Sequence, residues 1–196
     1  MNRERLTAFS DGVIAIIITI MVLELRPPAG ADWTALAGTL PFFLAYLLSF
    51  LYVAIYWNNH HHLLQTVRRV TGGIMWANTH LLFWLSLTPF ATAWMGEHYR
   101  ATVPAAVYGL ALLMPAIAYY ILQAAIIASE GRSSVLARAL GTDIKGKLSP
   151  MAYALGIGLA FIDPWLSDIV YAVVALIWLI PDRRIERRLV AAGEPD

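Results

Sequence analysis

The sequence predicts an all-α integral membrane protein with six transmembrane helices. Three observations lead to this fold class. Apolar residues make up 59% of the chain and charged residues only 14%, and the mean hydropathy is +0.63. Long apolar segments recur between proline-containing boundaries. Basic residues gather in alternate connecting segments, a pattern typical of multi-pass membrane proteins.

The first four spans have the length of crossing helices, for which about 20 apolar residues are needed. The third span is expected to kink at Pro89 and the fourth to bend at Pro115, because an interior proline removes a helix hydrogen bond. These spans are predicted at residues 5–25, 39–66, 73–95 and 103–129.

The last two spans are shorter and are predicted at residues 149–162 and 164–180. Each is expected to start at an N-cap followed by proline, at Ser149-Pro150 and at Asp163-Pro164. Their tight connection predicts a helical hairpin. Since the chain shows no internal repeat, residues 1–196 are predicted to form one transmembrane domain. Only the 130–148 connection is judged long enough to carry a surface helix.

Charge sets the expected orientation. Twelve of the fourteen Lys and Arg residues lie in the N-terminal segment, the 66–72 and 130–148 connections and the C-terminal tail. The positive-inside rule therefore places both termini in the cytoplasm of a multi-pass cell-membrane protein. Membrane lipids are expected partners, and the basic tail at residues 182–189 is expected to face anionic lipid.

Composition also excludes several function classes. A net charge of +1 gives no electrostatic basis for binding nucleic acid. The absence of cysteine excludes disulfides, thiolate catalysis and cysteine-bound metals. The histidines have neither a nucleophile nor a convincing set of ligands beside them, so we predict neither an enzyme nor a cofactor.

Rare polar residues of the first three spans are expected at one depth, near the cytoplasmic side. The second span carries Asn58 to His62 there, while Asp11 and Asn78 reach a similar depth at ~1.5 Å per residue. Polar groups inside a membrane normally pair with one another. We therefore expect a hydrogen-bonded polar belt in which Asp11 bonds a histidine, an asparagine or both. Which of His60, His61 and His62 it meets stays open.

The three consecutive histidines raise the alternative of a metal site. Adjacent helical residues point about 100° apart, so three in a row cannot share one metal. No second histidine stands four residues from any of them. The belt is therefore interpreted as structural, with no metal, and a further alternative is that single histidines only face lipid headgroups.

The first span carries an apolar stripe interrupted by small and hydroxyl side chains. At about 100° per residue, five residues share an arc about 100° wide, and Asp11 lies outside it. One interpretation is that Thr19 bonds its own backbone and the isoleucines only pack. The other is that several copies surround an axis, with apolar rings that gate by dewetting and favour weakly hydrated cations. The stripe consists of Gly12, Ile16, Thr19, Ile20 and Leu23.

The segment Arg5-Leu-Thr-Ala-Phe9-Ser10-Asp11 fits an RxxxFSD signature, and YWNNHHHLL follows at 56–64. With six spans, the chain resembles the transmembrane protein 175 family, the endolysosomal potassium channels and their bacterial relatives. Eukaryotic members carry two six-span repeats, so a single one resembles the prokaryotic form.

The resemblance implies a homotetramer in which four first helices line a cation pathway. It also implies that Ile16 is the main constriction, that Thr19 supports potassium preference, and that Ile20 and Leu23 add apolar constrictions. The signature residues would hold the helix in place. The resulting set of structural residues is Arg5, Phe9, Ser10, Asp11, Asn59, His60, His61, Asn78 and His80.

These inferences together predict a passive potassium-permeable channel with potassium ions in its pore. The alternative is a proton-coupled secondary transporter that uses Asp11 and the histidines. Transporters usually show repeats and broken helices around a midplane site, whereas the polar layer here is off-centre. The channel is therefore the preferred interpretation.

Overall fold

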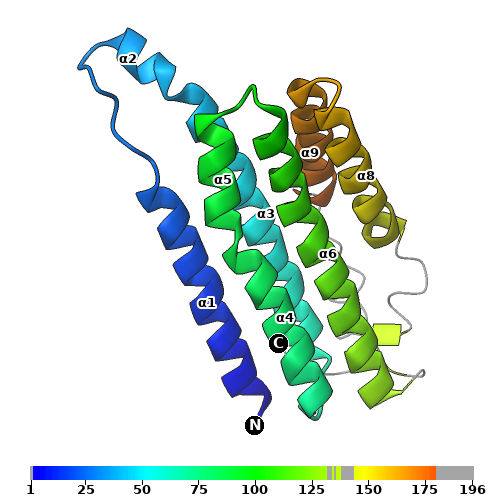
Figure 1. Cartoon of the computed structure of the whole chain (residues 1–196). Coiled ribbons are helices and arrows are strands. Elements are labelled where there is room, and N and C mark those ends of the chain that lie inside the picture. Colours follow the sequence, from blue (N-terminus) through cyan, green and yellow to red (C-terminus); the bar gives the residue numbers. More distant parts are fainter. Residues whose placement is uncertain (1, 132–133, 135, 138–143, 180–196) are drawn as a thin grey trace.

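The structure, a computed structural model, describes residues 2–131, 134, 136–137 and 144–179. The long helices lie side by side, with α1 at one edge of the bundle and the α8–α9 pair at the other (Figure 1). The predicted all-α fold is confirmed. The helices are α1 (Arg3–Leu23), α2 (Trp33–Gly38), α3 (Leu40–Gln65), α4 (Gly72–Ser86), α5 (Thr88–Glu97), α6 (Thr102–Glu130), α8 (Ile144–Ala160) and α9 (Pro164–Leu179).

Within the described residues, α1, α3 and α6 are long and apolar enough to cross a membrane. Their ends lie within two residues of the predicted first, second and fourth spans. The shorter apolar helix α9 begins at Pro164, the predicted start of the sixth span. Residue 180, where that span was expected to end, and the basic C-terminal tail lie outside the described residues.

The prolines act differently at the three places where sequence singled them out. The expected kink at Pro89 is a break at Leu87 between α4 and α5, and Pro89 lies in the first turn of α5, where its missing N–H costs no hydrogen bond. Pro115 lies inside the continuous helix α6. The predicted start of the fifth span at Ser149-Pro150 is wrong, because α8 already begins at Ile144.

The bonding of Ser149 shows that this residue is not the N-cap of α8. Its hydroxyl donates to the carbonyl of Lys145 four residues earlier, at 2.8 Å, instead of capping a helix. A serine before a proline therefore resembled an N-cap in the sequence, although it lies within the second turn of the helix.

The connection between α1 and α3 carries a helix that the sequence analysis did not expect. Asp32 caps α2, and its Oδ1 accepts from the amide of Ala35 at 2.7 Å. The expectation that only residues 130–148 can carry a surface helix is therefore wrong. A cap and six residues suffice for such an element, which is too short to show a hydrophobic period.

The buried side chains form two clusters. The first joins α1 to α3, α4 and α6, and the second joins α3, α5, α6, α8 and α9. In the second, the Tyr171 ring lies so close to Gly109 and Gly156 that a Cβ atom on either would overlap it. The first cluster holds one face of α1, and it thereby determines which face of this helix stays uncovered.

Candidate functional site

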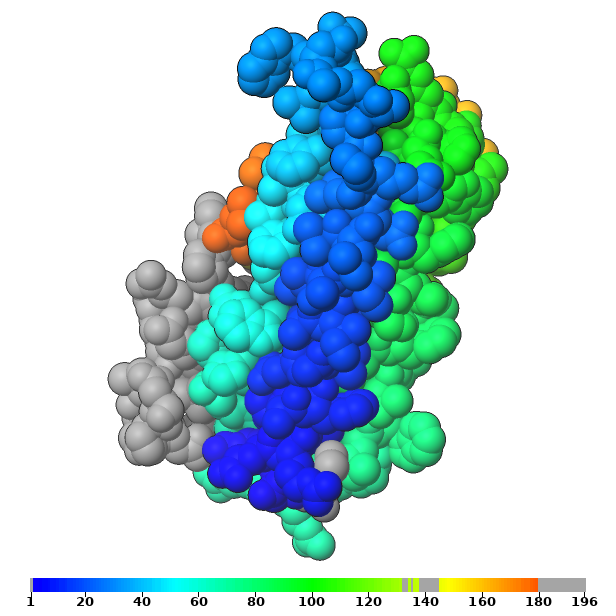
Figure 2. Space-filling model, turned by 90° about the vertical axis from the view of Figure 1, so that its left-hand side faces the viewer, coloured from blue at the N-terminus to red at the C-terminus, as the bar shows by residue number. Residues whose placement is uncertain are grey.

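One face of α1 has no partner among the described residues. The helix runs uncovered along the molecular surface in Figure 2, in blue. Ile16 is 59% exposed and Leu23 is 76% exposed. On the opposite face, Ile14 and Ile17 are only 1% and 2% exposed. All five residues of the predicted stripe are exposed: Gly12, Ile16, Thr19, Ile20 and Leu23.

This division follows from how α1 packs. The helix contacts α3, α4 and α5, and its buried apolar side chains all lie on one side and belong to the first cluster. The large side chains of the stripe are left facing outward, although the burial of apolar groups of this size is energetically favourable. The uncovered face therefore has the properties of a surface that meets another copy, lipid or a dewetted path.

Thr19 lies within this face and bonds its own helix. Its hydroxyl donates to the carbonyl of Ala15 at 2.8 Å, as the backbone-bonding interpretation expects. A hydroxyl has one donor and two acceptor lone pairs. The bond uses the donor only, so the exposed oxygen of Thr19 keeps its capacity to accept or to coordinate a cation.

Behind the uncovered face, three buried side chains form a directed hydrogen-bonded chain. His60 Nε2 donates to Asn78 Oδ1 at 2.6 Å, and Asn78 Nδ2 donates to Ser10 Oγ at 2.9 Å. Ser10 donates in turn to the carbonyl of Leu6 at 2.9 Å. Ser10, Asn78 and His60 are all at most 1% exposed.

The direction of these hydrogen bonds determines which atoms carry the protons. Ser10 has one hydrogen, which goes to the backbone, so its oxygen accepts from the amide of Asn78. This orients the Asn78 carbonyl toward His60, whose Nε2 must then carry the proton. His60 Nδ1 is buried without a partner among the described residues. This series of hydrogen bonds connects α1, α3 and α4 and ends on the backbone of α1.

Asp11 does not join this chain. The prediction that it bonds a histidine or an asparagine is corrected, because Asp11 Oδ1 accepts from the indole Nε1 of Trp57 at 3.0 Å. Depth alone placed Asp11 beside the polar residues of α3. Sequence reasoning missed Trp57 because hydropathy counts tryptophan as apolar, although its N–H is a donor that needs a partner. Its position next to Asn58 was the available signal.

The other polar residues of the second and third spans have local partners. His61 and His62 both contact the Gln65 side chain, at 3.2 and 3.4 Å. His80 Nε2 accepts from the indole of Trp84 at 2.8 Å. The predicted belt is therefore a three-residue chain with separate bonds around it.

The remaining members of the predicted set contribute little to the belt through their side chains. Asn59 contributes its backbone carbonyl, which accepts from the hydroxyl of Tyr119 at 3.0 Å. Arg5 donates its backbone amide to the N-cap Asn2, and its side chain is exposed. Phe9 is 57% exposed on the outward side of α1.

Comparison with known proteins places this geometry in a family. The model of the family described as "Endosomal/lysosomal potassium channel TMEM175" matches residues 5–89. A relative named a potassium channel, from Chryseobacterium sp. (strain P1-3), is 57% identical over 189 residues, covering 96% of this chain and 98% of the relative. The chain belongs to the TMEM175 family.

A structural comparison agrees with this TMEM175 membership. The chain is similar to the crystal structure of a lysosomal potassium-selective channel TMEM175 homolog from Chamaesiphon minutus, with a TM-score of 0.79. The two are 29% identical, and the match covers 91% of this chain and 96% of the other. The human protein named "Endosomal/lysosomal proton channel TMEM175" is 35% identical over 103 residues, 46% of this chain and 20% of the human one.

Membership in the TMEM175 family and the apolar helices together identify a membrane protein. The residues that match the family model include α1, α3 and α4, and so both the uncovered stripe and the Ser10–Asn78–His60 chain. The predicted recognition of a prokaryotic member is confirmed.

The directed chain makes a prediction about stability. Asn78→Leu removes both bonds of Asn78 and leaves the buried Nε2–H of His60 without an acceptor. An unsatisfied buried donor costs about 1–3 kcal/mol, so this variant should melt at a lower temperature than the wild type in detergent. Adding His60→Leu removes the orphaned donor and should recover part of the loss.

Thr79→Val provides the control for this series, because Thr79 is exposed on the same helix and bonds only the carbonyl of Met75. It should melt within error of the wild type. An Asn78→Leu protein as stable as the control would contradict the assigned bonds.

Proposed function

We propose that this chain is a passive, potassium-permeable cation channel, and that the uncovered stripe of α1 lines its pore. The observation that carries the proposal is the outward position of all five stripe residues. Relatives along nearly the whole chain are named potassium channels, from Chryseobacterium and from Streptomyces collinus, the latter 34% identical over 190 residues. The family relationship supports the channel class, and the stripe supports the location of the path.

The pore is formed by four copies, as the resemblance to the family implies. The stripe of one chain cannot enclose an axis, so a symmetric homo-oligomer is required, and only the family resemblance sets the number of copies at four. In this arrangement Ile16, Ile20 and Leu23 form successive apolar rings, and such rings close a pore by dewetting. They disfavour a small, strongly hydrated cation more than a larger one that loses its water more readily.

Thr19 provides the polar ring between the apolar ones. Because its proton is committed to the Ala15 carbonyl, the oxygen lone pairs are what each copy presents outward. Four such oxygens around an axis replace part of the hydration shell of a permeating potassium ion. This is the proposed source of any preference for potassium over sodium.

The proposed topology has six crossings, made by α1, α3, the α4–α5 pair, α6, α8 and α9. Both termini are placed in the cytoplasm of the cell membrane, because the basic segments then all lie on the inner side. The short helix α2 and the hairpin between α8 and α9 are placed at the outer end.

Proton permeation is a second candidate, favoured by the names of the human and bovine relatives, which are called proton channels. A proton-coupled transporter through Asp11 and the histidines is the third. These alternatives differ in measurable ways: a proton path follows a pH gradient in symmetric potassium, and a transporter saturates and accumulates its substrate.

The first test is a bi-ionic reversal potential. Purified protein in planar bilayers, with potassium on one side and sodium on the other, should reverse toward the potassium potential. Ile16→Asn should raise the cation current severalfold, because an amide wets the narrow apolar ring. Val22→Asn is the matched control, since Val22 is also exposed but lies about 120° around the helix from Ile16.

Equal effects of the two substitutions would remove the stripe from the conduction path. A current that reverses with the pH gradient in symmetric potassium would favour the proton channel instead. Saturable uptake in liposomes without conductance would favour the transporter.

The second test addresses Thr19. Thr19→Ala removes the oxygen and should lower the potassium-to-sodium permeability ratio by about fivefold, if each conducting ion loses a contact worth about 1 kcal/mol. Thr19→Ser keeps the hydroxyl and should keep the ratio. Indistinguishable ratios in wild type, Thr19→Ala and Thr19→Ser would show that this hydroxyl takes no part in selectivity.

A further inference from the structure

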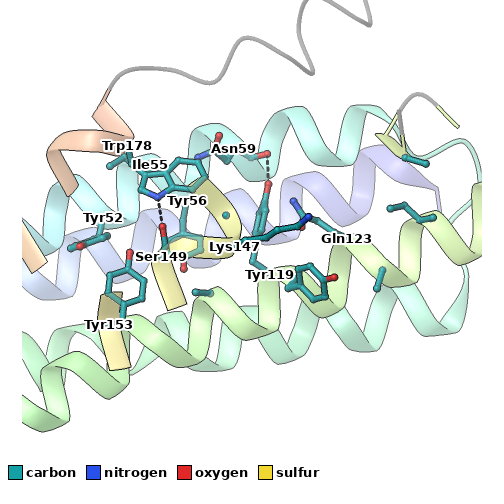
Figure 3. Close-up of a pocket in the computed structure, with 16 residues that line it drawn as sticks. Tyr52, Ile55, Tyr56, Asn59, Tyr119, Gln123, Lys147, Ser149, Tyr153 and Trp178 are labelled. Atoms are coloured by element: carbon teal, nitrogen blue, oxygen red, sulfur yellow. Dashed lines mark hydrogen bonds between the residues drawn. The ribbon is translucent and has the colours of Figure 1, made fainter. Parts of the chain in front are cut away.

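A cavity of about 310 Å³ lies between α3, α6, α8 and α9, on the side of the bundle away from α1 (Figure 3). Small-molecule sites are typically concave, at least this large, mostly apolar, and provided with a few polar groups. The cavity meets each of these criteria. Aromatic side chains dominate its walls: Tyr52, Tyr56, Tyr119, Tyr120, Tyr153 and Trp178.

Several polar groups of the wall already have partners, which holds the cavity open. The indole Nε1 of Trp178 donates to Ser149 Oγ at 2.8 Å, and the hydroxyl of Tyr119 donates to the Asn59 carbonyl at 3.0 Å. The rings of Tyr119 and Tyr56 also meet edge to face at 6.0 Å. These contacts tie α3 to α6 and α8 to α9, so the walls are formed without a ligand.

Gln123 is the exception among the buried polar side chains of this wall. It lines the cavity from α6 and is only 7% exposed, yet its amide has no hydrogen-bond partner among the described residues. A buried amide without a hydrogen-bond partner is costly in an apolar helix. The amide is therefore positioned to bond something that enters the cavity.

Lys147 provides a charge beside this amide. It extends from α8 next to Gln123 in Figure 3, while Tyr52, Tyr153 and Trp178 lie to one side of the pair. The cavity thus combines one cationic and one amide group with an aromatic compartment. Basic pockets between helices are a common means of holding anionic lipid headgroups.

We propose that this cavity binds a single-chain amphiphile with an acidic phosphate headgroup. The headgroup accepts from the ammonium group of Lys147 and the amide of Gln123, and the hydrocarbon chain lies among the tyrosines and Trp178. This ligand matches the charge, the unpaired amide and the apolar walls together. It also occupies a site away from the α1 face, so the inference does not depend on the proposed pore.

The test compares two lipids with equal chains. Native mass spectrometry of the full-length protein in neutral detergent should show saturable binding of lysophosphatidylglycerol, up to one per chain. Lysophosphatidylcholine, which has no net charge, should bind at least about tenfold more weakly, because its quaternary ammonium group offsets the phosphate charge that attracts Lys147. Glycerophosphoglycerol, which lacks the chain, should not compete.

Three variants locate the binding. Gln123→Leu and Lys147→Gln should each weaken lysophosphatidylglycerol about tenfold, and Ala124→Phe should block the cavity from α6. Ala128→Phe is the matched control, one turn further along the same helix and outside the lining. Melting temperatures establish that each variant is folded, and Lys147 is exposed, so its substitution leaves the core intact.

Equal affinity for the two lysolipids would contradict the proposal that the ligand has an acidic headgroup. If glycerophosphoglycerol competed as strongly as lysophosphatidylglycerol itself, the proposed role of the hydrocarbon chain in binding would be contradicted. Unchanged binding in folded Lys147→Gln and Ala124→Phe proteins would show that the lipid binds elsewhere, on the outer surface of the bundle.

Discussion

The rotation of α1 about its own axis is the constraint on which the rest of this structure depends. The helix is apolar over most of its circumference, so hydrophobic burial alone distinguishes its faces weakly. Two polar bonds remove the ambiguity. Ser10 lies about 120° around the helix from Ile16, in the middle of the buried face, and Asp11 lies about 100° further on. Ser10 bonds Asn78 of α4 and Asp11 bonds Trp57 of α3, so two neighbouring helices hold α1 at one rotation.

Both bonds lie near the N-terminal end of α1, and in the part of the chain that the structure describes no side chain of another helix bonds the stripe beyond them. The side chain of Thr19 bonds only its own backbone. Along α1, the bonds that anchor the helix are thus separate from the surface that we propose to line the ion path. On the far side of the bundle, the aromatic cavity around Gln123 is built from α3, α6, α8 and α9 and shares no lining residue with α1.

Much of this could be predicted from sequence, for physical reasons that differ by element. Apolar length located α1, α3 and α6 within two residues, because a crossing helix must satisfy its backbone internally. The angular spacing of Gly12, Ile16 and Thr19 identified the uncovered face. The depth of Asn78 and His60 identified residues that do meet. The depth of a residue does not determine the direction of its side chain around the helix, however. Depth alone therefore predicted a histidine or asparagine partner for Asp11, whereas Ser10 is the residue that bonds Asn78.

The remaining features depended on information that a hydropathy pattern lacks. Trp57 acts through one N–H on an apolar ring system, and Ser149 bonds within a helix that it was expected to start. The short helix α2 has fewer than two turns in which to show a period. Gln123 is a single polar residue in a long apolar helix, and only the packing of four helices shows that it faces a cavity.

The most direct test of the account is cysteine accessibility on α1, because the natural chain contains no cysteine. Leu23→Cys and Val22→Cys place one thiol each on adjacent, exposed positions, about 100° apart on the helix. A cationic methanethiosulfonate reagent applied to open channels in a bilayer should block the current of Leu23→Cys and leave that of Val22→Cys unchanged. Block of both variants, or of Val22→Cys alone, would contradict a pore lined by the stripe.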